Sequence, residues 1–365
     1  MHIFAFIAML FGVFWLLNPT KPPISFIKPP TLTKTTPHFS PPALLPTPPV
    51  QSVHSASLSA LGKHTLLAAY FGGSKEAKSD VCIWGNLYNT QTGQWSQAFK
   101  LLDPRTLSHQ AHEFVKILGN PVLYTHQNRL YLFVVGASLG GWATSKIYVL
   151  SAPANKPQAL HYEQTLHLSP LLNISHLVRN PPTPTTDGGF VLPIYHELAK
   201  KSPVFLKFDS HTHLQFLLRP NSLKQQLQPS LVPYQHCAFV AYRSYKTERF
   251  YTQSCLDFWH WQKPLLNNLS NHDSANTLFN ANGVLYLIYN QALPHHKNAR
   301  GALRLARLEP KTGAFMPLKI LDRSQKGEVS YPFVMLFDNQ VHVLYTKERK
   351  AIAHMVFNLA YLKGL

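Results

Sequence analysis

Two carboxylates on one short polar loop are the residues of this sequence best suited to chemistry. Glu76 and Asp80 lie between an apolar run that ends in Gly72-Gly73 and a second run that begins at Val81. Only 16 of the 365 residues are acidic, so this loop concentrates a scarce residue type. Paired carboxylates on a loop held by rigid strands are what glycoside hydrolysis commonly uses. The alternative is a β-hairpin whose acids face water or form structural ion pairs, with Asp80 capping its own turn.

The charge balance favours an anionic partner. The formal net charge is +18, which attracts acidic glycans, phospholipid surfaces or nucleic acid. Nucleic acid is the weakest of these, because lysine and arginine are spread along the chain without a basic helix, zinc-finger spacing or aromatic RNA-binding motif. We therefore expect an acidic glycan as partner and no nucleic acid. No HExxH or clustered Cys/His pattern occurs, so we expect no metal site and no cofactor.

The three cysteines leave the redox state open. Cys237 and Cys255 lie on apolar runs that we expect to be neighbouring strands, so they could form a disulfide in an oxidising compartment. Cys82 would then be a buried free thiol. Three cysteines do not decide between this pairing and three free thiols.

The N-terminus carries a signal or anchor segment. Ile3–Leu17 is an unbroken run of 15 apolar residues, the length of a signal-peptide core and short for a full membrane span. Lys21, Lys28 and Lys34 follow it, and a strict positive-inside reading would leave the body in the cytoplasm. The extended tether that comes next favours export instead. We expect residues 1–17 to be a signal peptide or membrane anchor, and the body to be extracytoplasmic.

A proline-rich stretch separates this segment from the folded body. Residues 18–50 contain so many prolines that we expect a disordered, semi-rigid linker without helix or sheet pairing. The folded domain is expected to span residues 51–360.

From Gln51 onward, short β-prone runs alternate with turn residues and almost no helical periodicity is present, which predicts an all-β fold. Strand, polar turn and aromatic residue recur at Trp95, Phe216, Trp261 and Phe315, with room for one more unit near Tyr162. The last three aromatics are about 45 to 55 residues apart, the period of four-stranded propeller blades. A β-sandwich with coincidental turns is the alternative.

These units carry a family resemblance. Each repeat resembles a worn Asp-box, the Ser-x-Asp-x-Gly-x-Thr-Trp turn of sialidase-type propellers, and an ordered set of blocks from Gln51 to Val356 is similar to the sialidase-like branch with bacterial neuraminidase repeats. The blocks are His54-Ser55-Ala56-Ser57, Phe71-Gly72-Gly73, Glu76, Asp80, Ile83-Trp84, Gly119-Asn120-Pro121-Val122-Leu123, Gly141-Trp142, Arg179-Asn180-Pro181-Pro182, Leu192-Pro193-Ile194-Tyr195-His196-Glu197, Gln228-Pro229-Ser230-Leu231, Tyr242-Arg243-Ser244, Tyr289-Asn290, Arg300, Glu328-Val329-Ser330-Tyr331-Pro332, Tyr345, Arg349 and His354.

The resemblance implies a six-bladed β-propeller with its active site at the central axis. Sialidases clamp the substrate carboxylate with arginines and use an acidic residue as acid/base with a Tyr activated by a Glu as nucleophile. By position, Asp80 is then the first acid/base candidate and Glu76 the second. Tyr331 is the candidate nucleophile, and Glu197 and Glu328 compete as its base.

The same resemblance implies the binding residues. Arg243, Arg300 and Arg349 are the clamp candidates, with Arg179 as a fourth. Trp142 would stack on a sugar ring or close a blade. The Phe-Arg-Ile-Pro motif that supplies the first arginine in sialidases is absent, so the acidic sugar need not be sialic acid.

The expected function is an exo-acting, sialidase-like glycoside hydrolase for terminal acidic sugars, either sialic acid or uronic acids. A propeller that binds glycans without hydrolysis is one alternative. A scaffold that binds protein at its rim is another.

Overall fold

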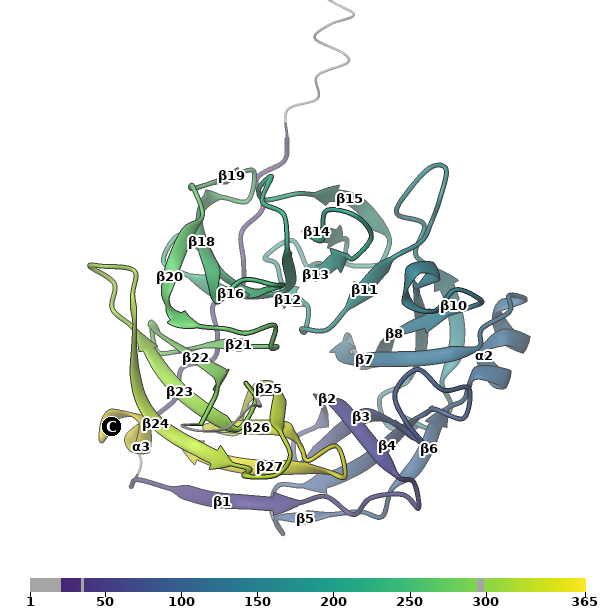
Figure 1. Ribbon diagram of the computed structural model, residues 1–365, viewed down its shortest axis with the longest axis horizontal. Coiled ribbons are helices and arrows are strands. Elements are labelled where there is room, and N and C mark those ends of the chain that lie inside the picture. The colour runs from purple at the N-terminus through teal and green to yellow at the C-terminus, as the bar shows by residue number, and fades with distance from the viewer. Residues whose placement is uncertain (1–20, 34–35, 294–298) are drawn as a thin grey trace, which may run out of the picture.

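Six antiparallel sheets stand around a central axis in the computed structural model, which describes residues 21–33, 36–293 and 299–365. Figure 1 shows each sheet as one blade, with one of its edge strands nearest the axis. The chain is therefore a six-bladed β-propeller, as predicted.

The six blades follow one another along the chain, and we number them in that order. Blade 1 consists of β2 (Ser52–Gly62), β3 (Thr65–Gly73), β4 (Cys82–Asn89), β5 (Gln94–Trp95) and β6 (Phe99–Leu102). Blade 2 consists of β7 (Ile117–His126), β8 (Arg129–Ala137), β9 (Lys146–Pro153) and β10 (His161–Thr165). Blade 3 consists of β11 (His176–Val178), β12 (Thr183–Pro184), β13 (Phe190–His196), β14 (Ser202–Phe208) and β15 (Leu214–Leu218). Blade 4 consists of β16 (Gln226–Tyr234), β17 (Cys237–Ser244), β18 (Arg249–Asp257), β19 (His260–Trp261) and β20 (Leu265–Ser270). Blade 5 consists of β21 (Thr277–Ala281), β22 (Val284–Gln291), β23 (Ala302–Leu308) and β24 (Phe315–Arg323). Blade 6 consists of β25 (Val329–Phe337), β26 (Gln340–Lys347), β27 (Ala351–Asn358) and β1 (Phe39–Leu44).

The ring is closed by the N-terminal part of the chain. β1 pairs antiparallel with β27 and supplies the outer strand of blade 6, which Figure 1 shows as a purple strand beside the yellow end of the chain. The expectation of an unpaired linker through residues 18–50 is therefore wrong for Phe39–Leu44. Its prolines are compatible with a strand because Pro41 and Pro42 occupy a register shift at the sheet edge, where no ladder hydrogen bond is needed.

Residues 21–33, which we call the N-terminal strap, are also docked on the propeller. Phe26 forms an isolated bridge with Thr185, and the side chain of Asn282 bonds both backbone groups of Leu32. The side chains of Ile24, Phe26 and Leu32 are buried, so hydrophobic burial fastens this segment despite its prolines. The linker prediction is wrong here too.

The strap crosses one end of the axis. It covers an apolar cavity of about 520 Å³, lined by strap residues such as Pro29 and by the far ends of inner strands, including Leu58, Leu231 and Phe333. The predicted signal or anchor segment, residues 1–17, lies outside the described residues. In the ranges that the structure describes, no helix is both long and apolar enough to cross a membrane.

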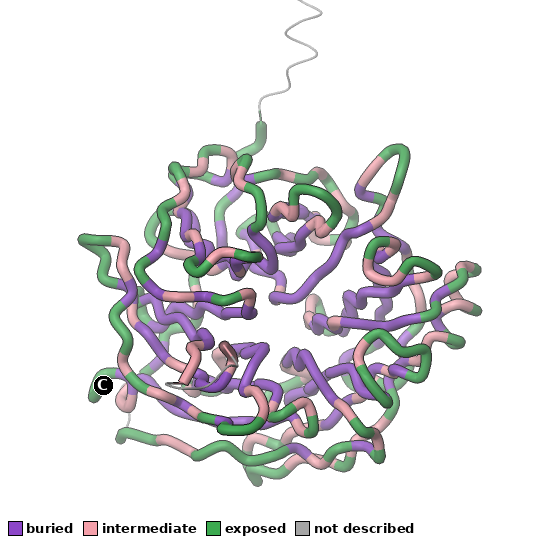
Figure 2. The backbone as a smooth tube through the Cα atoms, viewed as in Figure 1, coloured by how far each residue is buried: buried purple, intermediate pink, exposed green. Residues whose placement is uncertain are grey.

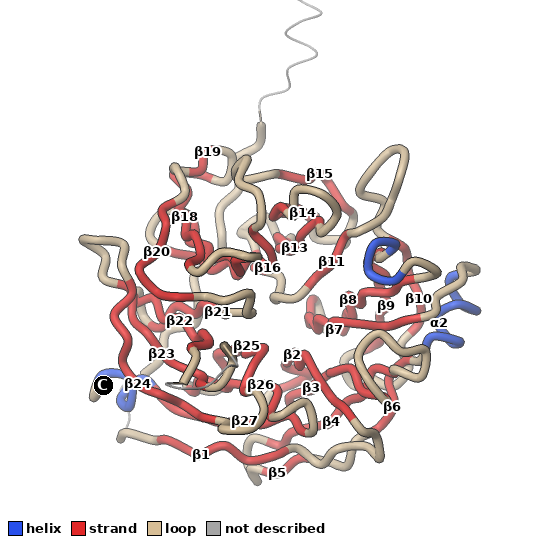
Figure 3. Tube along the Cα trace, viewed as in Figure 1, coloured by secondary structure: helices blue, strands red, loops and turns tan. Residues whose placement is uncertain are grey.

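The core lies between the blades. Figure 2 shows that the strands around the axis are buried while the outer loops are exposed, and the middle strands β8 and β22 are apolar along almost their whole length. The helices are short and lie in connections between strands or at the end of the chain (Figure 3): α2 (Pro104–Ala111), the 3-10 turn η1 (Gly141–Thr144) and α3 (Leu359–Lys363). The propeller core is thus built by sheet-on-sheet packing.

The aromatic repeat marks the outer strands. Trp95, Tyr162, Phe216, Trp261 and Phe315 lie on β5, β10, β15, β19 and β24, the outermost strand of each of blades 1 to 5. The predicted period is confirmed, including the unit near Tyr162. Blade 6 breaks the pattern because its outer strand comes from the other end of the sequence.

The structure pairs Cys237 with Cys255 across β17 and β18 in a disulfide, with the two Cα atoms 5.7 Å apart. Cys82 is free and half-buried. Among the alternatives that the sequence left open, the structure therefore has the bridge, which is consistent with an oxidising compartment.

Four inner strands carry a register shift near the same end of the axis. The shifts lie at His54/Ser57 in β2, Leu118/Pro121 in β7, Leu227/Ser230 in β16 and Ser330/Phe333 in β25. Three of these bulges hold a non-glycine residue at positive φ: Ser55 at 58°, Gln228 at 45° and Tyr331 at 54°. Such conformations cost on the order of 1 kcal/mol each and often re-aim a side chain at a functional site.

Candidate active site at the propeller axis

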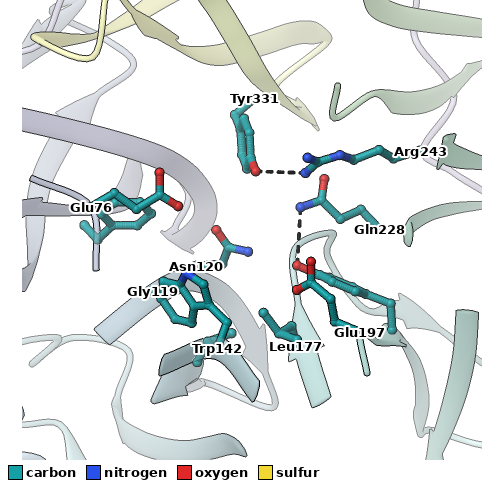
Figure 4. Close-up of a pocket in the computed structure, with 12 residues that line it drawn as sticks. Glu76, Gly119, Asn120, Trp142, Leu177, Glu197, Gln228, Arg243 and Tyr331 are labelled. Atoms are coloured by element: carbon teal, nitrogen blue, oxygen red, sulfur yellow. Dashed lines mark hydrogen bonds between the residues drawn. The ribbon is translucent and has the colours of Figure 1, made fainter. Parts of the chain in front are cut away.

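A cavity of about 130 Å³ opens at the end of the axis where the inner-strand bulges lie. Figure 4 shows side chains from different blades pointing into it. One side is apolar and the other polar. The lining residues are Phe71, Glu76, Gly119, Asn120, Val135, Trp142, Leu177, Tyr195, Glu197, Gln228, Arg243 and Tyr331.

Tyr331 reaches the cavity from the bulge of β25. Its side chain is buried, and its hydroxyl accepts a hydrogen bond of 3.0 Å from Nη1 of Arg243 (Figure 4). Burial raises the pKa of the Tyr331 hydroxyl, but the charges of Arg243 and Arg300 outweigh burial and leave the pKa below its ordinary value. The structure therefore favours the phenolate of Tyr331 more than that of an ordinary tyrosine.

Arg243 is the clamp candidate that lines the cavity. It extends from β17, and Asp273 accepts a hydrogen bond of 2.9 Å from its Nε and forms an ion pair with its Nη2 at 2.8 Å. Burial acts to lower the pKa of Arg243, but Tyr331 and Asp273 together raise it. Arg243 is consequently a fixed positive charge beside the Tyr331 hydroxyl.

Arg300 and Arg349 stand behind this edge of the cavity and do not line it. The carboxylate of Glu328 lies between them, 3.4 Å from Nη1 of Arg300 and 3.1 Å from Nε of Arg349. Arg300 also donates to the backbone carbonyl of Asp273 at 2.9 Å. The structure brings both arginines to the site, but each is bound to protein acceptors.

Glu76 lies at the rim of the cavity. Its Oε2 is 2.6 Å from Nη1 of Arg349, and about a third of its side chain is exposed. The Glu76–Arg349 pair joins the first blade to the last. Burial acts to lower the pKa of Arg349, while the hydrogen bond to Glu76 and the charge of Glu328 raise it above the ordinary value.

Asp80 is not brought into the cavity. Its side chain is exposed, and its two oxygens accept hydrogen bonds from the backbone N–H of Ser74 at 2.8 Å and from the Ser74 hydroxyl at 2.9 Å. Asp80 thus fastens the start of its own loop, which is the alternative that the sequence left open. Of the two loop acids, the structure places Glu76 at the cavity.

Neither glutamate expected to act as base contacts the Tyr331 hydroxyl. The Oε1 of Glu328 accepts hydrogen bonds from Arg349 and, at 2.7 Å, from Ser330. Glu197 lines the opposite wall, where Lys201 lies 3.6 Å from its Oε1. Figure 4 places Glu197 near Gln228 and away from Tyr331. Among the described hydrogen bonds, the partner of the Tyr331 hydroxyl is an arginine.

Arg179 does not fit the role of a fourth clamp. Its side chain is buried, with 1% of its surface exposed, and it is not among the residues that line the cavity. Its Nη2 donates to the backbone carbonyls of Tyr331 and Pro332 at 2.8 and 3.1 Å. It therefore holds the backbone of the Tyr331 bulge from outside the cavity.

Trp142 forms the apolar wall together with Leu177 (Figure 4). Its ring lies against Gly119, where a Cβ atom would be 2.6 Å from Cη2 of the tryptophan. Only glycine leaves room for this ring position. The indole is thus both packed against blade 2 and presented to the cavity, so the two roles named for it are compatible.

Four further residues of the family-like blocks, for which no role was predicted, lie at or beside the cavity: His54, Asn120, Tyr195 and Gln228. Asn120 and Gln228 line the cavity, and Nε2 of Gln228 donates to the Tyr195 hydroxyl at 3.4 Å. The signal that could have found them is the residue-before-proline position, which recurs in Asn120-Pro121, Gln228-Pro229 and Tyr331-Pro332.

His54 lies against the face of Tyr331, with the ring centroids 4.2 Å apart. It is buried, and neither ring nitrogen has a hydrogen-bond partner in the described structure. Burial and the surrounding charges of Arg349, Arg300, Arg179 and Arg243 lower its pKa well below the ordinary value. His54 is therefore a neutral ring inside a cationic cluster.

The described residues contain no group of three or more side chains of the types that hold metal ions. The titratable groups that line this cavity are two phenols, two carboxylates and one guanidinium: Tyr195, Tyr331, Glu76, Glu197 and Arg243.

Residues 64–343 match the family of the BNR repeat-like domain. The match covers most of the chain, so the protein belongs to this family. A comparison with curated proteins found no match in sequence.

Solved structures share the fold at low sequence identity. A Dyadobacter fermentans protein of unknown function has a TM-score of 0.68 and 11% identity over 88% of this chain and 99% of its own. A Trypanosoma rangeli sialidase in complex with sialic acid has a TM-score of 0.63 and 10% identity over 94% of this chain and 60% of its own. A Hadza microbial sialidase has a TM-score of 0.64 and 12% identity over 85% of this chain and 66% of its own. The chain thus spans about two thirds or less of the two sialidases, and the likeness concerns the propeller fold.

Proposed function

We propose that this protein is an exo-acting glycoside hydrolase for a terminal acidic sugar, with Tyr331 as nucleophile and Glu76 as acid/base. The observation that carries the proposal is the Tyr331 hydroxyl, held by Arg243 at 3.0 Å inside an axial cavity and lowered in pKa by two arginines. Tyrosine nucleophiles are a known exception to the two-carboxylate scheme of glycoside hydrolysis. A small cavity of about 130 Å³ that opens at one end of the axis suits the end of a sugar chain better than its middle.

The steps balance as a double displacement. The phenolic proton of Tyr331 passes to solvent, and the phenolate oxygen attacks the anomeric carbon while the glycosidic C–O bond breaks. Glu76, as a carboxylic acid, gives its proton to the departing oxygen. Water then attacks the anomeric carbon, gives a proton back to Glu76 and releases Tyr331.

Positive charge at the polar wall supports an acidic substrate. Arg243 faces the cavity, and the net charge of the chain is +18. Guanidinium groups bind carboxylates through paired hydrogen bonds. A substrate carboxylate would lie at Arg243, with the apolar wall of Trp142 and Leu177 facing the opposite side of the ring.

One observation favours a second candidate function, glycan binding without hydrolysis. The group next to Tyr195 at the polar wall is the amide of Gln228, which cannot accept a proton from a phenol as a carboxylate does. Because neither Glu197 nor Glu328 contacts the Tyr331 hydroxyl, the activation of Tyr331 would depend on the charges of Arg243 and Arg300, with a smaller contribution from the Gln228 amide.

The test is sugar release from a panel of sialosides and uronides, with binding measured in parallel by calorimetry. Tyr331→Phe should abolish release but keep binding within a few-fold. Tyr345→Phe is the matched control, since its buried hydroxyl bonds Asp322 away from the cavity. Binding without release by the wild type would support the second function. Neither binding nor release from any member of the panel would sink both.

A further inference from the structure

Arg179 is a buried arginine whose role the proposed reaction leaves open. It lies on the connection between β11 and β12, and its Nε and Nη1 have no hydrogen-bond partner in the described structure. None of the ion pairs found among the described residues includes it. Burial lowers the pKa of this guanidinium to about 10, which still leaves it charged at neutral pH. A buried charge without a counter-charge is expensive, so its contacts call for a function.

The hydrogen bonds of Arg179 go to Tyr331, the proposed nucleophile, and to the proline that follows it. Its Nη2 donates to two successive carbonyls, those of Tyr331 at 2.8 Å and Pro332 at 3.1 Å. Its guanidinium carbon also lies over the Tyr331 ring, 5.2 Å from the centroid. One side chain from blade 3 therefore holds both the backbone and the ring of a residue in blade 6.

The neighbouring residue makes the same contact with another blade. Nδ2 of Asn180 donates to the carbonyls of Gln228 at 3.0 Å and Pro229 at 2.9 Å. Gln228 and Tyr331 share a positive φ, a following proline and a β-bulge. Arg179 and Asn180 thus bind the equivalent bulges of two blades.

We propose that Arg179 is a positioning residue that holds Tyr331 in its bulged conformation, so that the hydroxyl stays at Arg243. Its consequence for catalysis rests on the hydrolase function proposed above. Without Arg179, nothing bridges the carbonyls of Tyr331 and Pro332, and Tyr331 relaxes toward an extended φ. Relaxing a bulge changes the local register, and a one-residue change turns a side chain to the other face of its strand. The hydroxyl then leaves Arg243.

The direct readout is the titration of the Tyr331 hydroxyl in the full-length protein. It is followed by NMR of ¹³C-labelled tyrosine, with the signal assigned from Tyr331→Phe. In the wild type, this signal titrates below the ordinary tyrosine range, as the two arginine charges require. In Arg179→Met, which keeps the length but loses the donors and charge, the titration should move up by about one pH unit or more.

Activity adds a second readout where the wild type hydrolyses substrate. Arg179→Met should lower kcat by about 10²-fold with little change in KM, because a misplaced nucleophile loses rate more than affinity. Arg179→Lys should recover part of both losses, since an ammonium can reach one carbonyl but lacks the fork. Asn180→Ala is the matched control, because it releases the Gln228 bulge and leaves the contacts of Arg179 with Tyr331 and Pro332. Gln228 is a lesser cause of the lowered Tyr331 pKa than the two arginine charges, so the titration should move less in this variant than in Arg179→Met.

The outcomes separate the two proposals. An unchanged Tyr331 titration in folded Arg179→Met overturns the positioning role, whatever the activity. If that variant does not fold, Arg179→Lys carries the same test, and an unchanged titration there has the same meaning. A wild type without hydrolysis removes the proposed reaction, while a shifted titration would still support the positioning role.

Discussion

Arg349 and Glu76 are 273 positions apart in the sequence, and their side chains meet with 2.6 Å between Nη1 and Oε2. This ion pair fixes the loop of blade 1 against the last blade at the cavity rim. The same arginine holds Glu328 through its Nε at 3.1 Å. The position of Glu76 thus depends on ring closure as well as on its own loop.

Glu76→Gln should therefore remove proton transfer while keeping the loop in place, because the amide oxygen can still accept from Arg349. We expect sugar release to fall by about 10²- to 10⁴-fold with binding largely retained. Asp80→Asn changes the other acid of the loop, which lies outside the cavity. Steady-state kinetics of the two variants check this, and a larger loss in Asp80→Asn than in Glu76→Gln would contradict the assignment.

Gly119→Ala should displace Trp142, because the new Cβ would be 2.6 Å from the indole. We expect a loss of ligand affinity of about tenfold or more, together with about 1–3 kcal/mol of stability from overpacking. Gly136→Ala is the matched control in the same blade. Its Cβ would be 2.6 Å from the ring of Tyr148, and neither residue lines the cavity. Calorimetry and urea denaturation separate the effects. Equal affinity losses in both variants would mean that Trp142 only packs.

The buried histidine pair of blade 6 should make the fold sensitive to acid. His342 and His354 lie 3.1 Å apart between Nδ1 and Nε2, and Nε1 of Trp95 donates to His354. Burial lowers their pKa values to about 4 and about 3, respectively. The unfolded chain therefore binds more protons than the folded one below pH 6.5, and stability falls as the pH drops from there toward 4. Each histidine contributes a slope of up to about 1.4 kcal/mol per pH unit.

Urea denaturation between pH 5 and pH 8 measures this slope. His342→Gln should reduce it by close to one histidine's share, and the same change at the exposed His211 is the surface control. His54 and His176, whose pKa values are also lowered by burial, act in the same direction and remain in both variants. An unchanged slope in His342→Gln would remove this histidine from the account.

The disulfide predicts a thiol count. With Cys237 and Cys255 paired and Cys82 free, denatured but unreduced protein should react with one equivalent of thiol reagent. Replacing both paired cysteines by alanine should cost about 2–4 kcal/mol, since the bridge closes a loop in the unfolded chain. Titration with a thiol reagent, followed by denaturation of the double variant, checks both points. Three reactive thiols before reduction would contradict the pairing.

The outer blade strands could be predicted because each carries an aromatic residue in the same place of a repeated pattern, which runs from Trp95 to Phe315. β1 could not, because the prolines around Phe39–Leu44 suggest an unpaired chain, and only the open edge of β27 makes that segment a strand. Local sequence has no record of a partner more than 300 residues away.

The site follows the same division. Tyr331 and Arg243 could be placed by their family-like blocks, and they do meet. The sequence could not show which of Glu76 and Asp80 faces the cavity. The direction of each side chain depends on its partner, which is Arg349 for Glu76 and Ser74 for Asp80. Arg179 looked like a clamp because its charge is visible in the sequence while its burial is not.

The N-terminal strap keeps the start of the described chain away from the mouth of the cavity. It crosses the axis at the end opposite the cavity, and Lys21 lies over Trp259, 5.1 Å from the ring centroid. A tag or solid support joined ahead of Lys21 would therefore start from the outer edge of blade 4, beside β19, and not from the mouth of the cavity (Figure 1). Immobilisation through this end should leave access for large glycans on another surface, whereas coupling through the loop of Glu76 should block it.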